Sequence, residues 1–133
     1  MIYLLDTDTC IYILNHEPER VRYKFEQIEL SRVAISSITL LELDAGGRKG
    51  SRVEENLAKV ERFASSLTVL PFTAATARVA GKLKQDLRSA GTPIGDMDLL
   101  IAAHGLSLGA IVVTNNLREF ARVPDLRVEN WLE

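Results

Sequence analysis

The sequence predicts an α/β fold, a three-layer α/β/α sandwich around a central, mainly parallel sheet. Short apolar runs alternate along the chain with longer segments whose apolar residues recur at helical spacing, a pattern typical of βαβ units. The run Ala110–Val113 (AIVV) is almost unbroken in its apolar character, as expected of a strand buried on both faces. With 133 residues, the chain fits one domain over residues 1–133.

The first quarter of the chain is expected to form a strand, two helices and a second strand. Met1–Leu5 is a short apolar run and a candidate buried strand, and the largely apolar segment Thr7–Asn15 follows as a helix. Pro18 suits the first turn of a second helix through Phe25. The run Val33–Ile38 (VAISSI) has the composition of a strand.

The middle of the chain predicts two helices and an edge strand. Thr39–Ala45 is expected to form a short helix that two glycines end. Ser51 is expected to cap a long helix with apolar residues at spacings of three and four. Thr68–Phe72 is a candidate strand, and its proline favours an edge position or a strand end.

The last part of the chain continues the alternation. Thr73 is expected to cap a helix with an apolar stripe, and a further helix over Asp96–Leu108 is closed by Gly109. After the strand at Ala110–Val113, a short helix over Leu117–Arg122 precedes an extended piece at Leu126–Trp131.

Composition excludes several classes of protein. Hydrophobic residues make up 47% of the chain and charged residues 26%, an ordinary globular balance. The single cysteine, Cys10, allows no internal disulfide and is expected to be a buried thiol. No apolar run approaches the ~18 residues of a membrane span, so we expect a cytoplasmic protein with no membrane partner. The formal charge of −2 argues against holding long nucleic acid by bulk charge alone, but a short one could be held by a local basic patch.

Oxygen-bearing side chains follow the predicted strands. Asp6 comes after the first strand, Glu42 lies in the helix after the second, and Asn116 follows the strand at Ala110–Val113. Asp98 opens the helix before that strand. Because sites in parallel α/β folds form beyond the carboxyl ends of the strands, we expect these side chains to gather at one edge of the sheet.

Helix capping is the simpler interpretation of some of these acids. Asp8 and Asp96 are good N-cap or first-turn residues, which the helix dipole favours. Glu42 and Asp98 are different, because each directly adjoins leucines that indicate a largely buried segment. Because buried carboxylates are almost always paired with another group, we expect Glu42 and Asp98 to have a functional role.

Several carboxylates at one edge would call for a cation. Two unit charges ~4 Å apart repel by roughly 4 kcal/mol at an effective dielectric near 20. Oxygen ligands favour Mg²⁺ or Mn²⁺, whereas His16 and His104 stand alone and no zinc spacing is present. A magnesium site of this kind usually acts on phosphate groups.

One candidate phosphate chemistry is that of haloacid-dehalogenase phosphatases. The stretch 6–9 (DTDT) resembles their opening motif, with Asp6 as nucleophile, and Ser36 or Ser37, Lys82 and the GDMD of residues 95–98 could mimic the later motifs. However, the late acidic motif should follow an apolar strand, and here it begins a helix. This interpretation also leaves Glu42 without a role.

A second resemblance covers nearly the whole chain. The stretches YLLDTDTCIYIL, VAISSITLLEL, GTPIGDMDLLIAAHGLSLGAIVVTNNLREFARV and VENW occur in this order. They resemble the PIN-domain ribonucleases, most closely the VapC toxins of prokaryotic toxin–antitoxin pairs. The third stretch is the most specific.

The resemblance implies a Mg²⁺- or Mn²⁺-dependent endoribonuclease that cleaves RNA with a metal-activated water. It places the family's first three acids on Asp6, Glu42 and Asp98, and its fourth position on Asn116, where many relatives carry aspartate. Asp6 and Asp98 would bind the metal, and Glu42 would orient or help deprotonate the attacking water. Asn116 would hold the water shell of the metal or the phosphate, with Thr114 in support.

The same resemblance implies partners. The RNA substrate would be structured, such as transfer or ribosomal RNA, and Arg48 and Lys49 in a glycine-rich loop are candidates to bind it. A cognate antitoxin would cover the acidic site, and the protein would form a homodimer. The phosphatase remains an alternative at this point, as does a non-enzymatic α/β binding module whose acids only cap helices.

Overall fold

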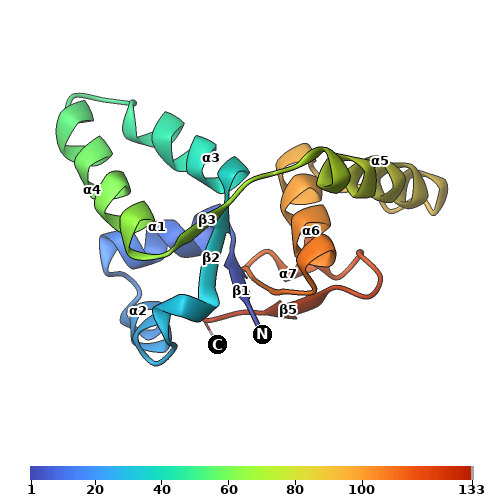
Figure 1. Cartoon of the computed structure of the whole chain (residues 1–133), viewed down its shortest axis with the longest axis horizontal. Helices are drawn as coiled ribbons and strands as arrows, with labels where there is room; N and C mark the ends of the chain where they lie inside the picture. The colour runs from blue at the N-terminus through green and yellow to red at the C-terminus, as the bar shows by residue number, and fades with distance from the viewer. Residues whose placement is uncertain (133) are drawn as a thin grey trace.

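Five parallel strands form one sheet in the computed structural model, which describes residues 1–132 (Figure 1). The order across the sheet is β3-β2-β1-β4-β5. The strands are β1 (Tyr3–Leu5), β2 (Val33–Ser36), β3 (Thr68–Leu70), β4 (Ile111–Val113) and β5 (Arg127–Glu129). The predicted parallel sheet is confirmed, and so is the edge position of the strand that ends next to Pro71.

Seven α-helices connect or follow these strands in the described residues. They are α1 (Thr7–Asn15), α2 (Glu19–Glu26), α3 (Ser37–Gly47), α4 (Val53–Ser66), α5 (Ala74–Ser89), α6 (Asp96–Leu108) and α7 (Leu117–Phe120). A 3₁₀ turn at Leu30–Arg32 leads into β2. Within residues 1–132, no helix is both long enough and apolar enough to cross a membrane.

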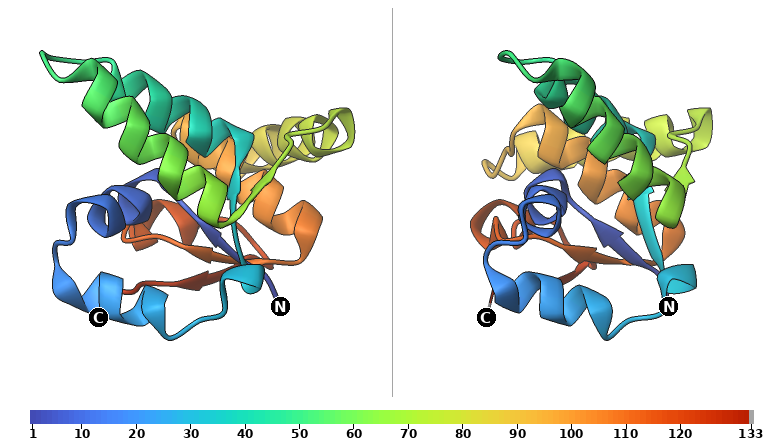
Figure 2. Two further views of the ribbon diagram at one scale, coloured as in Figure 1. Left: turned by 60° about the vertical axis from the view of Figure 1, so that its left-hand side comes forward. Right: turned by 90° about the vertical axis from the view of Figure 1, so that its left-hand side faces the viewer.

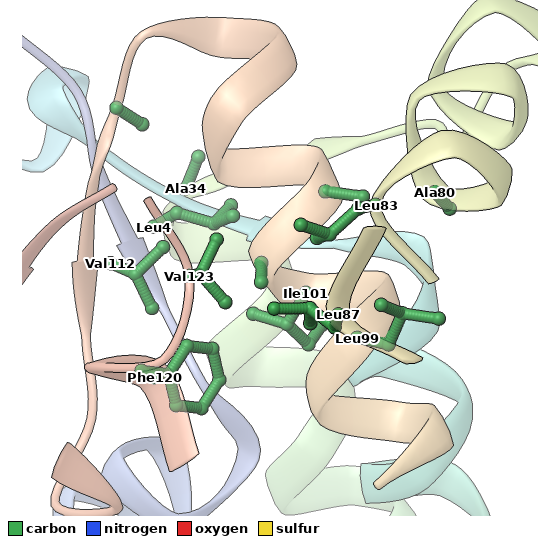
Figure 3. Packing of buried hydrophobic residues seen from close by; sticks show 13 residues of the cluster. Leu4, Ala34, Ala80, Leu83, Leu87, Leu99, Ile101, Val112, Phe120 and Val123 are labelled. Carbon is green, nitrogen blue, oxygen red and sulfur yellow. The ribbon is translucent and has the colours of Figure 1, made fainter. Parts of the chain in front are cut away.

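The two faces of the sheet are covered by different helices, which confirms the three-layer sandwich (Figure 2). Successive strand residues point to opposite faces, so Leu4 packs with residues of α5, α6 and α7 while Leu5 packs with residues of α1 to α4. Figure 3 shows the first of these clusters, in which Val112 lies beside Leu4 and Val123, and the leucines of α5 and α6 complete the other side of the cluster. Cys10 is fully buried in the second cluster, as expected.

Several helix boundaries differ from the sequence-based expectation, and α7 ends at Phe120, two residues earlier than predicted. The helix α3 begins at Ser37, inside the predicted strand, because the hydroxyl of Ser36 caps it by accepting the N–H of Ile38. Its two glycines form the last turn of the helix instead of ending it. The predicted cap at Ser51 is wrong, since Arg52 precedes α4 and makes no side-chain capping bond.

The helix α6 is held closely on the sheet. A side chain at Gly105 would bring its Cβ within 2.5 Å of Val112, so only glycine permits this approach of α6 to β4. Gly109 ends the helix in the left-handed conformation with φ of 62°, as predicted. This packing fixes the opposite end of α6, where Asp98 lies, relative to the sheet.

Candidate active site

The predicted site residues lie around the carboxyl ends of β1 and β4. From β1 the chain adds β2 and β3 on one side of the sheet and then β4 and β5 on the other. The boundary between β1 and β4 is therefore a topological switch point, where α/β folds bind ligands. The N–H of Asp6 donates to the carbonyl of Val113 at 2.9 Å and joins the two strand ends.

Asp6 is the N-cap of α1 and is only 6% exposed. Its Oδ1 accepts the N–H of Thr9 at 2.9 Å. Burial raises the pKa of Asp6, and hydrogen bonds from Thr114 and Thr9 oppose this rise while the charge of Asp8 adds to it. Asp6 therefore caps the helix, and Asp8 lies in its first turn.

Asp98 lies in the first turn of α6 and is half-buried. Its Oδ2 accepts the side-chain amide N–H of Asn116 at 2.8 Å. Burial and the charges of Glu119 and Asp6 raise the pKa of Asp98 to about 6, although the Asn116 hydrogen bond opposes the rise. The two aspartates thus lie close enough for the charge of one to affect the other.

Glu42 reaches the site from α3 through Thr7. The hydroxyl of Thr7, the residue after Asp6, donates to Oε1 of Glu42 across 35 positions of sequence. Leu41 is 54% exposed, so the segment is less buried than its composition indicates. Glu42 itself is half-buried.

Thr114 connects the two aspartates from behind. Its hydroxyl accepts the backbone N–H of Asn116 at 2.9 Å and hydrogen-bonds to Asp6. The side chain is fully buried, so in this structure it contacts the site through its hydrogen bonds to Asn116 and Asp6. Thr114 fixes the positions of Asp6 and Asn116.

Glu119 is a further acid that sequence reasoning did not select. Its charge raises the pKa of Asp98, and its Oε2 is buried without a hydrogen-bond partner. Glu119 lies in α7, three residues after Asn116. A spacing of one helical turn from Asn116 is the signal that could have revealed it.

The oxygen-rich site fits a hard divalent cation that has only a few protein ligands and is otherwise coordinated by water or substrate. Within residues 1–132, no three His, Cys, Asp or Glu side chains are arranged to hold a metal ion together. Mg²⁺ is commonly bound by one or two carboxylates, with water and substrate phosphates completing its coordination. The raised pKa of Asp98 and the unpartnered oxygen of Glu119 are consistent with a place for a positive charge.

The remaining candidates lie outside this network. Arg48 follows α3 and pairs with Asp44 at 2.6 Å, and Lys49 is exposed beside it. In the described part of the chain no hydrogen bond or ion pair joins either residue to Asp6 or Asp98. His104 is buried in α6 with its ring edge-on to Phe72, which indicates a structural role.

Comparison with known proteins identifies the family. The model of the PIN domain matches residues 3–126. The chain is 46% identical to a Salmonella typhimurium protein named tRNA(fMet)-specific endonuclease VapC, over 97% of each chain. It is 41% identical to a Rickettsia felis protein named Ribonuclease VapC2, over 98% of each chain.

Solved structures agree with the sequence relatives. The structure of DNA-bound VapBC from Salmonella typhimurium contains a chain with a TM-score of 0.92 and 46% identity, with 98% of each chain covered. VapBC2 from Rickettsia felis gives a TM-score of 0.89 and 40% identity, covering 98% of this chain and 99% of that one. The chain therefore belongs to the PIN domain family and, within it, to the VapC ribonucleases.

Proposed function

We propose that this protein is a cytoplasmic, metal-dependent endoribonuclease and the toxin of a type II toxin–antitoxin pair, folded as a single PIN domain over residues 1–133. The observation that carries the proposal is the hydrogen-bonded series that runs from Glu42 through Thr7, and from Asp6 through Thr114 and Asn116 to Asp98. This series lies at the switch point of the sheet in a chain of the VapC family.

Asp6 and Asp98 would hold a Mg²⁺ or Mn²⁺ ion. When bound, such an ion stabilises charge on the phosphate and lowers the pKa of its water. Asp6 brings a fixed oxygen, because the N–H of Thr9 and the hydroxyl of Thr114 restrain its carboxylate. Asn116 orients Asp98 by donating to its Oδ2.

Glu42 is proposed to orient the attacking water and accept its proton. The Thr7 hydroxyl occupies Oε1, which leaves Oε2 as the acceptor for a water. A base must lie within hydrogen-bond distance of the proton that it takes. The hydrogen bond from Thr7 limits the rotation of the Glu42 carboxylate and so helps to keep Oε2 in place.

The substrate is proposed to be a structured RNA, with initiator transfer RNA as the first candidate. A relative with 46% identity over 97% of each chain is named for activity on tRNA(fMet). Arg48 and Lys49 remain candidates for contacts with the RNA backbone. The phosphatase alternative is disfavoured by family membership and by the burial of Asp6, which leaves little room for attack on phosphorus.

The partners are proposed to be an antitoxin and a second copy of the chain. The similar solved structures are VapBC complexes. The carboxylates of Asp6, Asp98 and Glu119 would bind an arginine of the antitoxin, since a guanidinium forms bidentate hydrogen bonds with a carboxylate.

Sequencing of RNA 5′ ends after brief expression of the protein tests the function and identifies the target. We expect new ends at one or a few positions, and we expect Asp6→Asn to abolish them. Growth arrest with no new RNA ends, or the same ends from the Asp6→Asn variant, would reject the catalytic assignment.

A further inference from the structure

A cavity of about 500 Å³ lies away from the acids, between α1, α2 and α4. Four basic side chains line it together with Phe25 and Phe63, and among the described residues no Asp or Glu lines it. The helices that form its walls lie together on one side of the sheet (Figures 1 and 2). We refer to this feature as the basic cavity, with the basic side chains of His16, Arg22, Lys59 and Arg62.

Three of these cations have no carboxylate partner. Elsewhere in residues 1–132, carboxylates lie within 4 Å of the charged nitrogens of Arg48, Arg52, Lys82 and Lys84. No such ion pair involves Arg22, Lys59 or Arg62 within the same described residues. Arg22 donates one N–H to the carbonyl of Ile13 at 3.0 Å, which steadies it at the wall of the cavity. The basic cavity is therefore lined by three positive charges that form no ion pair within 4 Å in the described part of the chain, although Glu19 and Glu26 line a neighbouring pocket together with His16 and Arg22.

The basic cavity shares lining residues with a second cavity that reaches Glu42. A second cavity of about 250 Å³ lies between α1, α3 and α4 and has Glu42 in its lining. The two cavities share Leu14, Asn15 and Lys59. Lys59 thus lines both the cavity that contains Arg62 and the cavity that contains Glu42, the residue proposed to orient the attacking water.

We propose that the basic cavity binds the phosphodiester backbone of the substrate RNA, on one side of the bond that is cut. This inference rests on the proposed ribonuclease function. The carboxylates at the site repel the parts of a polyanion that a bound metal ion does not contact, so cations at a distance from the reacting phosphate would add to the free energy of substrate binding. Contacts with phosphates also set the register of a nucleic acid on a protein. Lys59 and Arg62 are exposed cations of the basic cavity, and Lys59 also lines the cavity that contains Glu42, so the pair can supply both effects.

Binding of a labelled initiator transfer RNA transcript tests this assignment. All proteins in this measurement carry Asp98→Asn, so that the RNA stays intact. The Asp98→Asn protein is compared with a variant that carries Lys59→Gln and Arg62→Gln in addition. The matched control adds Arg78→Gln and Lys82→Gln, which are also one lysine and one arginine on the exposed face of a single helix, α5.

We expect the pair in the basic cavity to weaken RNA binding by roughly tenfold. The slope of log K against log salt should fall in magnitude by about 1.4, because each lost contact with a single strand contributes about 0.7. With Asp98 intact, KM should rise while kcat stays near that of the parent protein. The α5 control should change none of these values.

Three outcomes would overturn the inference. One is equal RNA affinity and salt slope in the parent and the Lys59/Arg62 variant. Another is weaker binding of the antitoxin with unchanged RNA binding, which would make the basic cavity a peptide-binding site. If the parent protein cuts RNA and the Lys59/Arg62 variant keeps its KM, only this inference fails. If the parent neither binds nor cuts RNA, the proposed function fails with it.

Discussion

Asp6 and Asp98 approach the same edge of the sheet from opposite sides and are held in different ways. Asp6 is almost fully buried, and two hydrogen-bond donors, the N–H of Thr9 and the hydroxyl of Thr114, stabilise its charge. Asp98 is half-buried and has one donor, Asn116, while Glu119 and Asp6 repel its charge. Hydrogen bonds therefore hold the Asp6 carboxylate in place, whereas the negative charge of Asp98 is only partly compensated by its neighbours.

This difference indicates where a cation matters most. A carboxylate with good donors keeps its geometry without a metal, as Asp6 does through its role as the cap of α1. A carboxylate with negative neighbours is stabilised chiefly by a positive charge placed beside it. We therefore expect Asp98 to depend more on the cation than Asp6 does.

The largest expected effect is the loss of RNA cleavage in Asp98→Asn. Removing a direct ligand should lower kcat by at least about 100-fold, since changes to residues that only support a ligand already cost 10–100-fold. Single-turnover cleavage of transfer RNA in Mg²⁺ measures this effect, with Asp86→Asn on the exposed face of α5 as control. Activity within about threefold of the parent in Asp98→Asn would contradict the assignment.

The hydrogen bond from Thr7 to Glu42 should have a smaller effect on the reaction. Thr7→Val removes the donor but keeps the shape of the side chain, and kcat should fall by about tenfold. Thr7→Ser restores a hydroxyl and should recover most of the activity. A serine variant as slow as the valine variant would indicate that the hydroxyl is not what positions Glu42.

Stability against pH should also separate the two aspartates in metal-free protein. The folded-state pKa of Asp98 is about 6 and its reference value is 3.8, so between these values the folded protein binds the proton more tightly. Asp98 therefore leaves stability unaffected below about pH 4 and lowers it as the pH rises through 6.

At pH 7, the difference between 3.8 and about 6 corresponds to about 3 kcal/mol at most, and the exposed part of Asp98 reduces this to roughly 1 kcal/mol. Asp98→Asn should then raise Tm in EDTA by about 4 °C at pH 7 and by little at pH 4. Asp6→Asn should give a smaller rise, because asparagine has one acceptor oxygen where the aspartate has two to accept from Thr9 and Thr114. A drop in Tm for Asp98→Asn at pH 7 would show that the Asp98 carboxylate is not under strain.

The smallest expected effect concerns Glu119. Because its charge raises the pKa of Asp98, Glu119→Gln should lower that pKa, as followed by NMR titration of the Asp98 carboxyl carbon. The exposed Glu61 of α4 provides the matched control, Glu61→Gln. An Asp98 pKa that is the same in the Glu119 variant and the control would remove Glu119 from the site.

Much of the fold could be predicted from the sequence, because periodicity and end signals are local. Strand alternation, the buried run at β4 and the Gly109 stop identified the parallel sheet and the position of α6. The start of α3 was not predictable, since VAISSI reads as a single strand. Only the backbone position of Ile38 relative to the Ser36 hydroxyl decides that a helix begins there.

The site was predictable as a set of positions but not as a network. Residues directly after strands could be selected because parallel strands end at one edge. Thr7 and Glu119 were missed, since their roles depend on contacts across the fold, 35 positions to Glu42 in one case and from α7 to Asp98 in the other. The burial of Thr114 likewise follows from packing around β4, which its sequence neighbours do not reveal.

The central claim is that Asp6 and Asp98 share one divalent cation at the switch point of the sheet. A Mn²⁺ titration followed by electron paramagnetic resonance tests it directly on the parent protein, Asp6→Asn, Asp98→Asn and the Asp86→Asn control. We predict that the parent and the control bind Mn²⁺ with the same affinity, and that each site variant loses most of this binding, Asp98→Asn more than Asp6→Asn. Equal Mn²⁺ affinity in all four proteins would contradict the account.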